Sequence, residues 1–335
     1  MTTEPRTDVP TTVAAPREVP GWSFLPIGAA AALLGLLPWL VTGARLPLQN
    51  LWAGAPADAP IVLLPFSQYA ISLIGALVIV GALAAGIAGR ALGAASAKGA
   101  APLLVAGVVS VQLIAIAQTA ATVHAGLRIG DEATIYVAGL TTGAVFVVLV
   151  GVGVMLLLVR APRAGALIGL VVGAIAMSTW ISAFIAPLGS APVDAPSVVA
   201  LVLVTPWITP VLAGNAIAWA GVDTPGRIVA ALASVILVWV APAVLTGISS
   251  ALGTRIYANS PGDMLDYGMN VFGLALLIPE LALRPIIGVL ITAAIGLGIR
   301  WLLTRRRASV VHTERDAVAE APRQETRGGE GTRPA

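Results

Sequence analysis

Apolar and polar residues follow one another along this chain in long blocks, not in the short periods of soluble helices or strands. Eight mostly apolar blocks of roughly 18 to 25 residues are separated by short segments that carry nearly all of the charge. The pattern predicts an all-α fold, a polytopic transmembrane helix bundle of about eight spans. The predicted spans are 22–41, 66–88, 101–123, 135–159, 164–186, 197–220, 228–248 and 285–303.

The two ends of the chain lack this apolar character. Residues 1–21 and 304–335 are polar and charged, so both are predicted to be disordered tails around a transmembrane domain at 22–303. The first apolar block starts too late and runs too long for a secretory signal, so we assign it as a span. A further apolar stretch at 269–279 is too short to cross the bilayer, which predicts an external re-entrant or interfacial segment.

The distribution of Lys and Arg predicts the orientation, because positively charged loops resist translocation. One side of the predicted bundle carries Arg17, Arg90, Lys98, Arg160, Arg163, Arg227, Arg300, Arg305, Arg306 and Arg307, and the other carries only Arg45, Arg128, Arg255 and Arg284. Both termini are therefore predicted to be cytoplasmic. A composition rich in Ala, Gly, Val, Arg and Pro is typical of high-GC bacteria, which favours the plasma membrane of a bacterium, its inner membrane.

Composition also narrows the chemistry. Hydrophobic residues make up 58% of the chain and charged residues 10%, against roughly 25% in soluble domains. Without Cys, and with His124 and His312 as the only imidazoles, the chain lacks the common ligands for iron–sulfur, haem and zinc sites, so no cofactor is expected. The net charge of +3 is scattered over helix ends, which argues for the lipid bilayer as the partner and against nucleic acid.

A polar stripe follows the predicted helix 101–123. Gln112, Gln118, Thr119 and Thr122 fall within one arc of roughly 120° on a helix, and such a stripe should face protein or water instead of lipid. Hydrogen bonds between helices are the ordinary explanation. The alternative is that the stripe lines a solute path.

The predicted helix 197–220 contains two prolines one turn apart. Because proline lacks an N–H donor, Pro206 and Pro210 should kink or interrupt the helix, and interrupted helices often border transport sites. Thr205, Thr209 and Asn215 are the polar groups that would line such a site. A purely structural kink, with its backbone satisfied by the nearby Thr hydroxyls, is the competing interpretation.

Three glycines spaced four residues apart, Gly165, Gly169 and Gly173, form one face of the predicted helix 164–186. Small residues at this spacing allow a second helix to approach closely in lipid. The second helix can belong to the same chain, or to another copy or a membrane partner protein.

The favoured function is a permease-like protein that binds or moves a small or amphiphilic solute, based on the polar stripe and the double proline. The absence of charge from the central turns of the second to seventh spans weakens ion-coupled transport. The alternative is a non-enzymatic scaffold that binds partners through small-residue faces. An enzyme acting on a lipid-linked substrate, with Asp263, Asp266 and Glu280 at the external face and Glu280 paired with Arg284, is a third and weaker interpretation.

Overall fold

The computed structural model describes residues 19–47, 49, 51–53, 59–188, 195–254 and 260–320. These residues form a helical bundle without a β-strand, which confirms the predicted all-α class. The elements are, in chain order, η1 (Gly21–Ser23), α1 (Phe24–Val41), α2 (Ile71–Ala91), α3 (Ala100–Gly126), α4 (Asp131–Arg160), α5 (Arg163–Ile185), α6 (Ala195–Leu203), α7 (Thr205–Ala220), α8 (Pro225–Gly253), α9 (Pro261–Leu277) and α10 (Pro279–Glu320).

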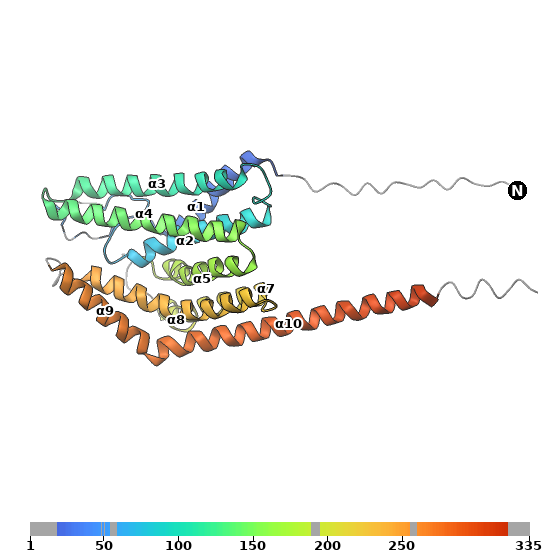
Figure 1. The fold of residues 1–335 in the computed structure, drawn as a ribbon. Coiled ribbons are helices and arrows are strands. Elements are labelled where there is room, and N and C mark those ends of the chain that lie inside the picture. Colours follow the sequence, from blue (N-terminus) through green and yellow to red (C-terminus); the bar gives the residue numbers. More distant parts are fainter. Residues whose placement is uncertain are drawn as a thin grey trace, which may run out of the picture.

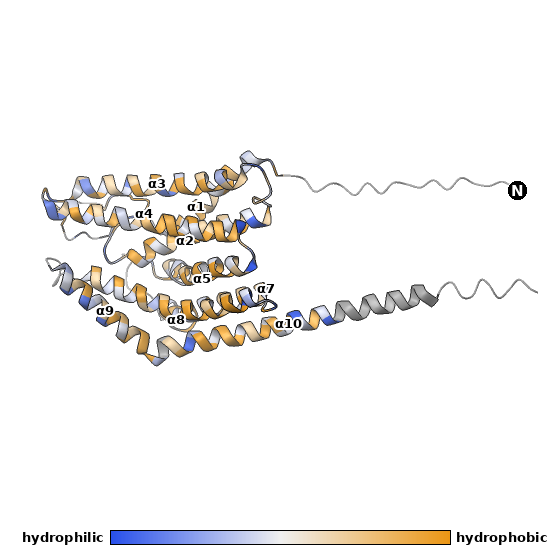
Figure 2. Cartoon of the chain, viewed as in Figure 1, coloured by the Kyte–Doolittle hydropathy of each residue, from blue (hydrophilic) through white to orange (hydrophobic). Residues whose placement is uncertain are grey.

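Seven of the predicted spans are helices long and apolar enough to cross a membrane within the described ranges. The predicted span 197–220 is instead divided at Val204 into α6 and α7. The start of α1 and the far end of α10 lie at the same end of the bundle (Figure 1), as an even number of crossings requires. We call this end the inner end and the opposite one the outer end. Apolar residues fill the length between them, and hydrophilic residues gather towards the two ends (Figure 2).

Close contact between α1 and α3 begins the packed core. A Cβ atom added to Gly28 of α1 would clash with the Leu104 carbonyl of α3, and one added to Gly107 would clash with the Leu25 carbonyl of α1. Backbones at this separation gain the dispersion contacts and weak Cα–H hydrogen bonds that stabilise helices in lipid.

The connection between α1 and α2 is folded into the outer end of this core. Val62, Leu64 and Phe66 are completely buried, and the Trp39 indole donates a hydrogen bond to the Val62 carbonyl at 2.8 Å. The predicted start of the second span at residue 66 is therefore wrong. α2 begins only at Ile71, because the apolar residues before it pack as an irregular segment.

The short apolar stretch predicted at 269–279 belongs to a longer helix, α9, which starts at Pro261 and ends at Leu277. α9 runs obliquely back from the outer end beside α8 and then bends into α10 (Figure 1). At 17 residues α9 is shorter than a span, and the chain does not return to the outer end after it, because α10 continues towards the inner end (Figure 1).

The last helix extends beyond the bundle. The predicted tail began at residue 304, but α10 continues to Glu320, because residues 304–320 contain no Gly or Pro and include several strong helix formers. Its apolar part, Ala282–Arg305, is the membrane-spanning candidate. The rest of this predicted tail, 321–335, and most of the N-terminal one, 1–18, lie outside the described residues.

Candidate functional site

The polar stripe of α3 binds the α1–α2 connection. The Gln118 side chain accepts a hydrogen bond from the Leu63 N–H at 3.0 Å and donates one to the Ile61 carbonyl at 3.1 Å. Beside it, the Thr119 hydroxyl accepts from the Leu64 N–H at 3.0 Å. Two α3 side chains thus satisfy an irregular backbone segment in the way a neighbouring strand would.

The remaining stripe residues are also engaged within the protein. Gln112 is 1% exposed and donates to the Val78 carbonyl of α2 at 2.9 Å. The Thr122 hydroxyl donates to the Gln118 carbonyl at 2.9 Å. The stripe therefore serves helix and loop packing, the ordinary explanation that the sequence offered.

The double-proline segment interrupts its helix, as predicted. α7 starts at Thr205 with Pro206 in its first turn, and Pro210 is buried inside α7. The Thr205 hydroxyl donates back to the Leu201 carbonyl in the preceding helix, α6. The break is therefore stabilised locally by a Thr hydroxyl.

Two further hydroxyls connect the interrupted helix to α5. Ser178 donates to the Thr205 carbonyl at 3.1 Å, and Thr209 donates to the Ala174 carbonyl at 3.0 Å. These reciprocal bonds join two helices without any charged group. Asn215, by contrast, is exposed and donates to the Val211 carbonyl of its own helix at 2.9 Å.

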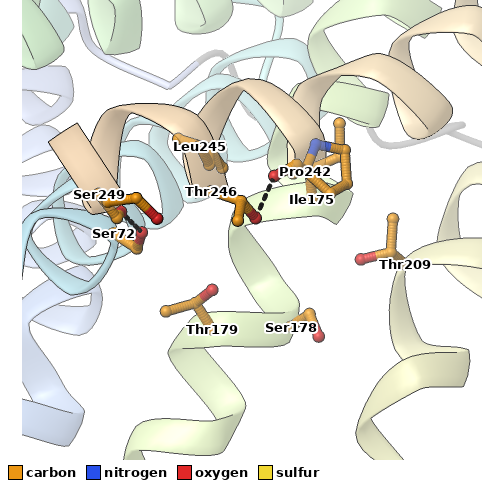
Figure 3. A pocket seen from close by; sticks show the side chains of 10 residues that line it. Ser72, Ile175, Ser178, Thr179, Thr209, Pro242, Leu245, Thr246 and Ser249 are labelled. Carbon is orange, nitrogen blue, oxygen red and sulfur yellow. Dashed lines mark hydrogen bonds between the residues drawn. The ribbon is translucent and has the colours of Figure 1, made fainter. Parts of the chain in front are cut away.

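A cavity of about 530 Å³ lies beside this junction, between α2, α5, α7 and α8. Seven of its ten lining residues carry hydroxyl groups, and the others are apolar. The lining consists of Ser72, Ile175, Ser178, Thr179, Thr209, Pro242, Leu245, Thr246, Ser249 and Ser250 (Figure 3).

The cavity occupies the outer half of the bundle. Ser72 is in the first turn of α2, and Ser249 and Ser250 are in the last turns of α8, so three lining residues sit near the outer ends of their helices. Ser72 and Ser249 share a hydrogen bond at 3.2 Å, and Thr246 donates to the Pro242 carbonyl at 2.9 Å (Figure 3). Each hydroxyl keeps further donor or acceptor capacity for a ligand or water.

Only one residue of the predicted solute path, Thr209, lines this cavity. α3 and α7 make no contact, so the polar stripe and the double proline do not converge. The lining Ser and Thr residues of α2, α5 and α8 were not predicted from the sequence. A signal existed, since Thr246, Ser249 and Ser250 follow the i, i+3, i+4 spacing of one helix face.

The glycine face of α5 is covered by the same chain. A Cβ on Gly169 would lie 3.1 Å from the Val154 carbonyl of α4, and one on Gly173 would lie 2.5 Å from the Leu83 side chain of α2. A Cβ on Gly165 would lie 2.7 Å from the Ala161 side chain. At Gly169 and Gly173 the closely approaching helix therefore belongs to the same chain.

The external acids are only partly within the described residues. Asp263 and Asp266 are exposed on α9, and the side chain of Glu280 lies outside the described residues. Arg284, the expected partner of Glu280, has its guanidinium 5.1 Å from the centre of the Trp207 ring. This cation–π contact places the start of α10 against the start of α7.

Comparisons with protein-family models, with curated proteins and with solved structures give no match for this chain.

Proposed function

We propose that this integral membrane protein is a permease-like protein that binds a small, uncharged solute in the hydroxyl-lined cavity of its outer half. The observation that carries the proposal is the gathering of seven hydroxyl side chains from four helices around one space. Hydroxyls in a membrane bundle are usually consumed by their own helix or by packing. A concentration of them around an open volume favours a wet interior.

Size and chemistry support a small molecule. The volume of about 530 Å³ is within the roughly 300–1,000 Å³ of small-molecule pockets. No Asp, Glu, Lys, Arg or His is among the lining residues, so an ionic solute would lose its hydration without gaining a counter-charge. An uncharged solute can exchange its hydrogen bonds with water for hydrogen bonds with Ser and Thr.

The position beside the interrupted helix agrees with this function. Irregular backbone at membrane depth is tolerated where it is buried in protein or borders a cavity. Thr205 and Thr209, at the start of α7, are held by α5 through the same Ser178 and Thr209 hydroxyls that line the cavity. A bound solute would therefore compete for the contacts that position α7.

The chain has no natural Cys, so thiol accessibility tests the proposal directly. Cys replaces Thr179 or Thr246 in the cavity wall, and Val123, which is completely buried beneath the α1–α2 connection, provides the matched control. We expect a membrane-impermeant thiol reagent to modify the two cavity variants from the outer side and to leave V123C unmodified. Equal inertness of all three would refute the proposal.

A partner-binding scaffold remains the second candidate, favoured by the sparse packing of α8 and α10. Only 22% and 17% of their apolar windows are buried inside the chain. Two results together would favour the scaffold. The cavity cysteines would all stay unlabelled, and a membrane protein that co-purifies with this chain would be lost when exposed α10 residues such as Ile291 and Ile295 are replaced.

A further inference from the structure

Charged side chains gather at the inner end of the bundle, opposite the cavity. Asp223, in the loop between α7 and α8, pairs with Arg300 of α10 at 2.9 Å and with Arg227 of α8 at 3.0 Å. These are the ion pairs found in the described part of the chain. A single carboxylate in the α7–α8 loop thus links the first turn of α8 to the middle of α10.

Arg300 also caps α7. Its guanidinium donates to the carbonyls of Ala218 and Trp219, at 3.3 and 3.4 Å, which belong to the unsatisfied last turn of the helix. Gly221 follows with φ +76°, and a Cβ there would collide with the same guanidinium. The chain therefore reverses at a position where only glycine leaves room for Arg300.

The other half of the bundle reaches the same point through Arg90 of α2. Arg90 donates to the carbonyls of Leu158 and Ala161, at 2.6 and 3.1 Å, at the end of α4. Its guanidinium lies 5.3 Å from the centre of the Trp219 ring. We call the set Arg90, Trp219, Asp223, Arg227 and Arg300 the inner clasp.

Between the cavity and the inner clasp, small side chains close the bundle. Ala213, Ala216 and Ala220 follow Thr209 along one face of α7, at i+4, i+7 and i+11, and are 0%, 7% and 0% exposed. They pack with Leu167 and Val171 of α5 and Val289 of α10. Ile217, which is 4% exposed, is a large side chain of α7 in the same cluster, so opening this face requires α7 to move away from α5.

We propose that the inner clasp is the inner gate of the solute path and that its release is coupled to closure of the outer cavity. This inference rests on the function proposed above. α7 is the coupling element, because its start is held by the cavity hydroxyls and its end by the clasp. Asp223 is 60% exposed, so water can replace its ion pairs when the gate opens.

The gate is tested with two reporter cysteines, one at Thr179 in the cavity and one at Ile217, which is 4% exposed near the inner end of α7. Each is labelled by an impermeant thiol reagent in right-side-out and inside-out vesicles. D223N breaks the clasp. D263N, which removes an exposed carboxylate of α9, is the matched control, and D223E tests rescue.

In D223N we expect labelling of I217C from the inner side to rise about tenfold and labelling of T179C from the outer side to fall by a similar factor, because one equilibrium governs both. D263N should change neither. A rise at I217C alone means local fraying of α7 and overturns the gate, as does no change at either reporter. If T179C is inert even with Asp223 intact, the cavity proposal itself fails.

Discussion

The first four helices and the last ones solve the problem of packing in lipid differently. In α1, α2, α3 and α4, between 39% and 56% of each apolar window is buried inside the chain, whereas the fractions in α8 and α10 are 22% and 17%. The first region packs through glycine contacts and binds an inserted loop with α3 side chains, and it also contains two buried polar atoms without a hydrogen-bond partner among the described residues, Gln112 Oε1 and Thr141 Oγ1. The second leaves hydroxyls facing a cavity and large aliphatic side chains facing outwards.

This difference in packing predicts that the first region is rigid and that the second can move. A region in which backbones touch and loop N–H groups are satisfied by side chains has few ways to rearrange. In the second region α7 and α10 are also in close contact, since a Cβ on Gly214 would lie 2.9 Å from the Val289 carbonyl. The polar contacts that hold the two ends of α7 are two hydroxyl bonds and an exposed ion-pair cluster, so α7 and α10 can shift together at low cost. We therefore regard α1–α4 as the scaffold and α7–α10 as the part that moves.

Separating α1 from α3 should have the largest effect on stability. Gly107→Leu would force its side chain against the Leu25 carbonyl and the Ala29 N–H, backbone atoms that cannot turn away. We expect destabilisation on the order of 3 kcal/mol or more, seen as a lower unfolding midpoint in detergent. Gly153→Leu on α4, where a Cβ meets nothing within 4 Å, is the control and should behave like the parent.

Gly169→Leu tests whether the α5 glycine face serves the chain or its assembly. The face is occupied by α4 and α2, so we expect a loss on the order of 2 kcal/mol in stability and an unchanged fraction of crosslinked oligomer. Crosslinking in membranes followed by denaturing electrophoresis measures the second quantity. A selective loss of oligomer at normal stability would show that a second copy uses this face.

Thr119→Val tests the inserted loop. It removes the acceptor of the buried Leu64 N–H while keeping the side-chain shape, which should cost about 1 to 2 kcal/mol. Unfolding of the detergent-solubilised protein gives the value. Thr142→Val, on the exposed face of α4, is the control and should leave the free energy of unfolding unchanged. Equal losses of stability in the two variants would show that the loop does not contribute to the stability of the scaffold.

The smallest effect is expected at the cavity rim. Ser72→Ala removes one hydroxyl from the hydrogen bond with Ser249, a bond worth about 0.6 kcal/mol in a membrane bundle. Water should replace the lost partner, so unfolding should change little. A loss of stability comparable to that of Thr119→Val would mean that water does not reach Ser72 and that its hydroxyl serves only packing.

The sequence predicted seven of the spans and their approximate limits because each of them is a continuous apolar block. It predicted the break near Pro206 from the missing N–H donors. It did not predict that Val62 to Phe66 pack as a buried loop, because apolar residues give the same sequence pattern in a membrane span and in a buried loop. α9 was underestimated because Asp263 and Asp266 lie on its first turns, where they interrupt the apolar pattern.

The site was harder to predict because hydroxyls on different helices are brought together only by packing. Thr119 and Thr209 both lie inside predicted spans, and both belong to the polar groups predicted to line a solute path. In the structure Thr119 is 0% exposed and bonded to Leu64, whereas Thr209 lines the cavity. Helix rotation and loop insertion, which a single-helix pattern does not contain, decide between the two environments.

Thr119 and Thr209 can therefore show whether the polar groups under the α1–α2 connection are sealed while those around the cavity are in contact with water. The measurement is the ratio of labelling rates of T209C and T119C by one impermeant thiol reagent in intact membranes. We predict a ratio of at least about tenfold, because only an exposed thiol can ionise and react. A ratio near unity would contradict the division between a sealed scaffold and a water-filled cavity.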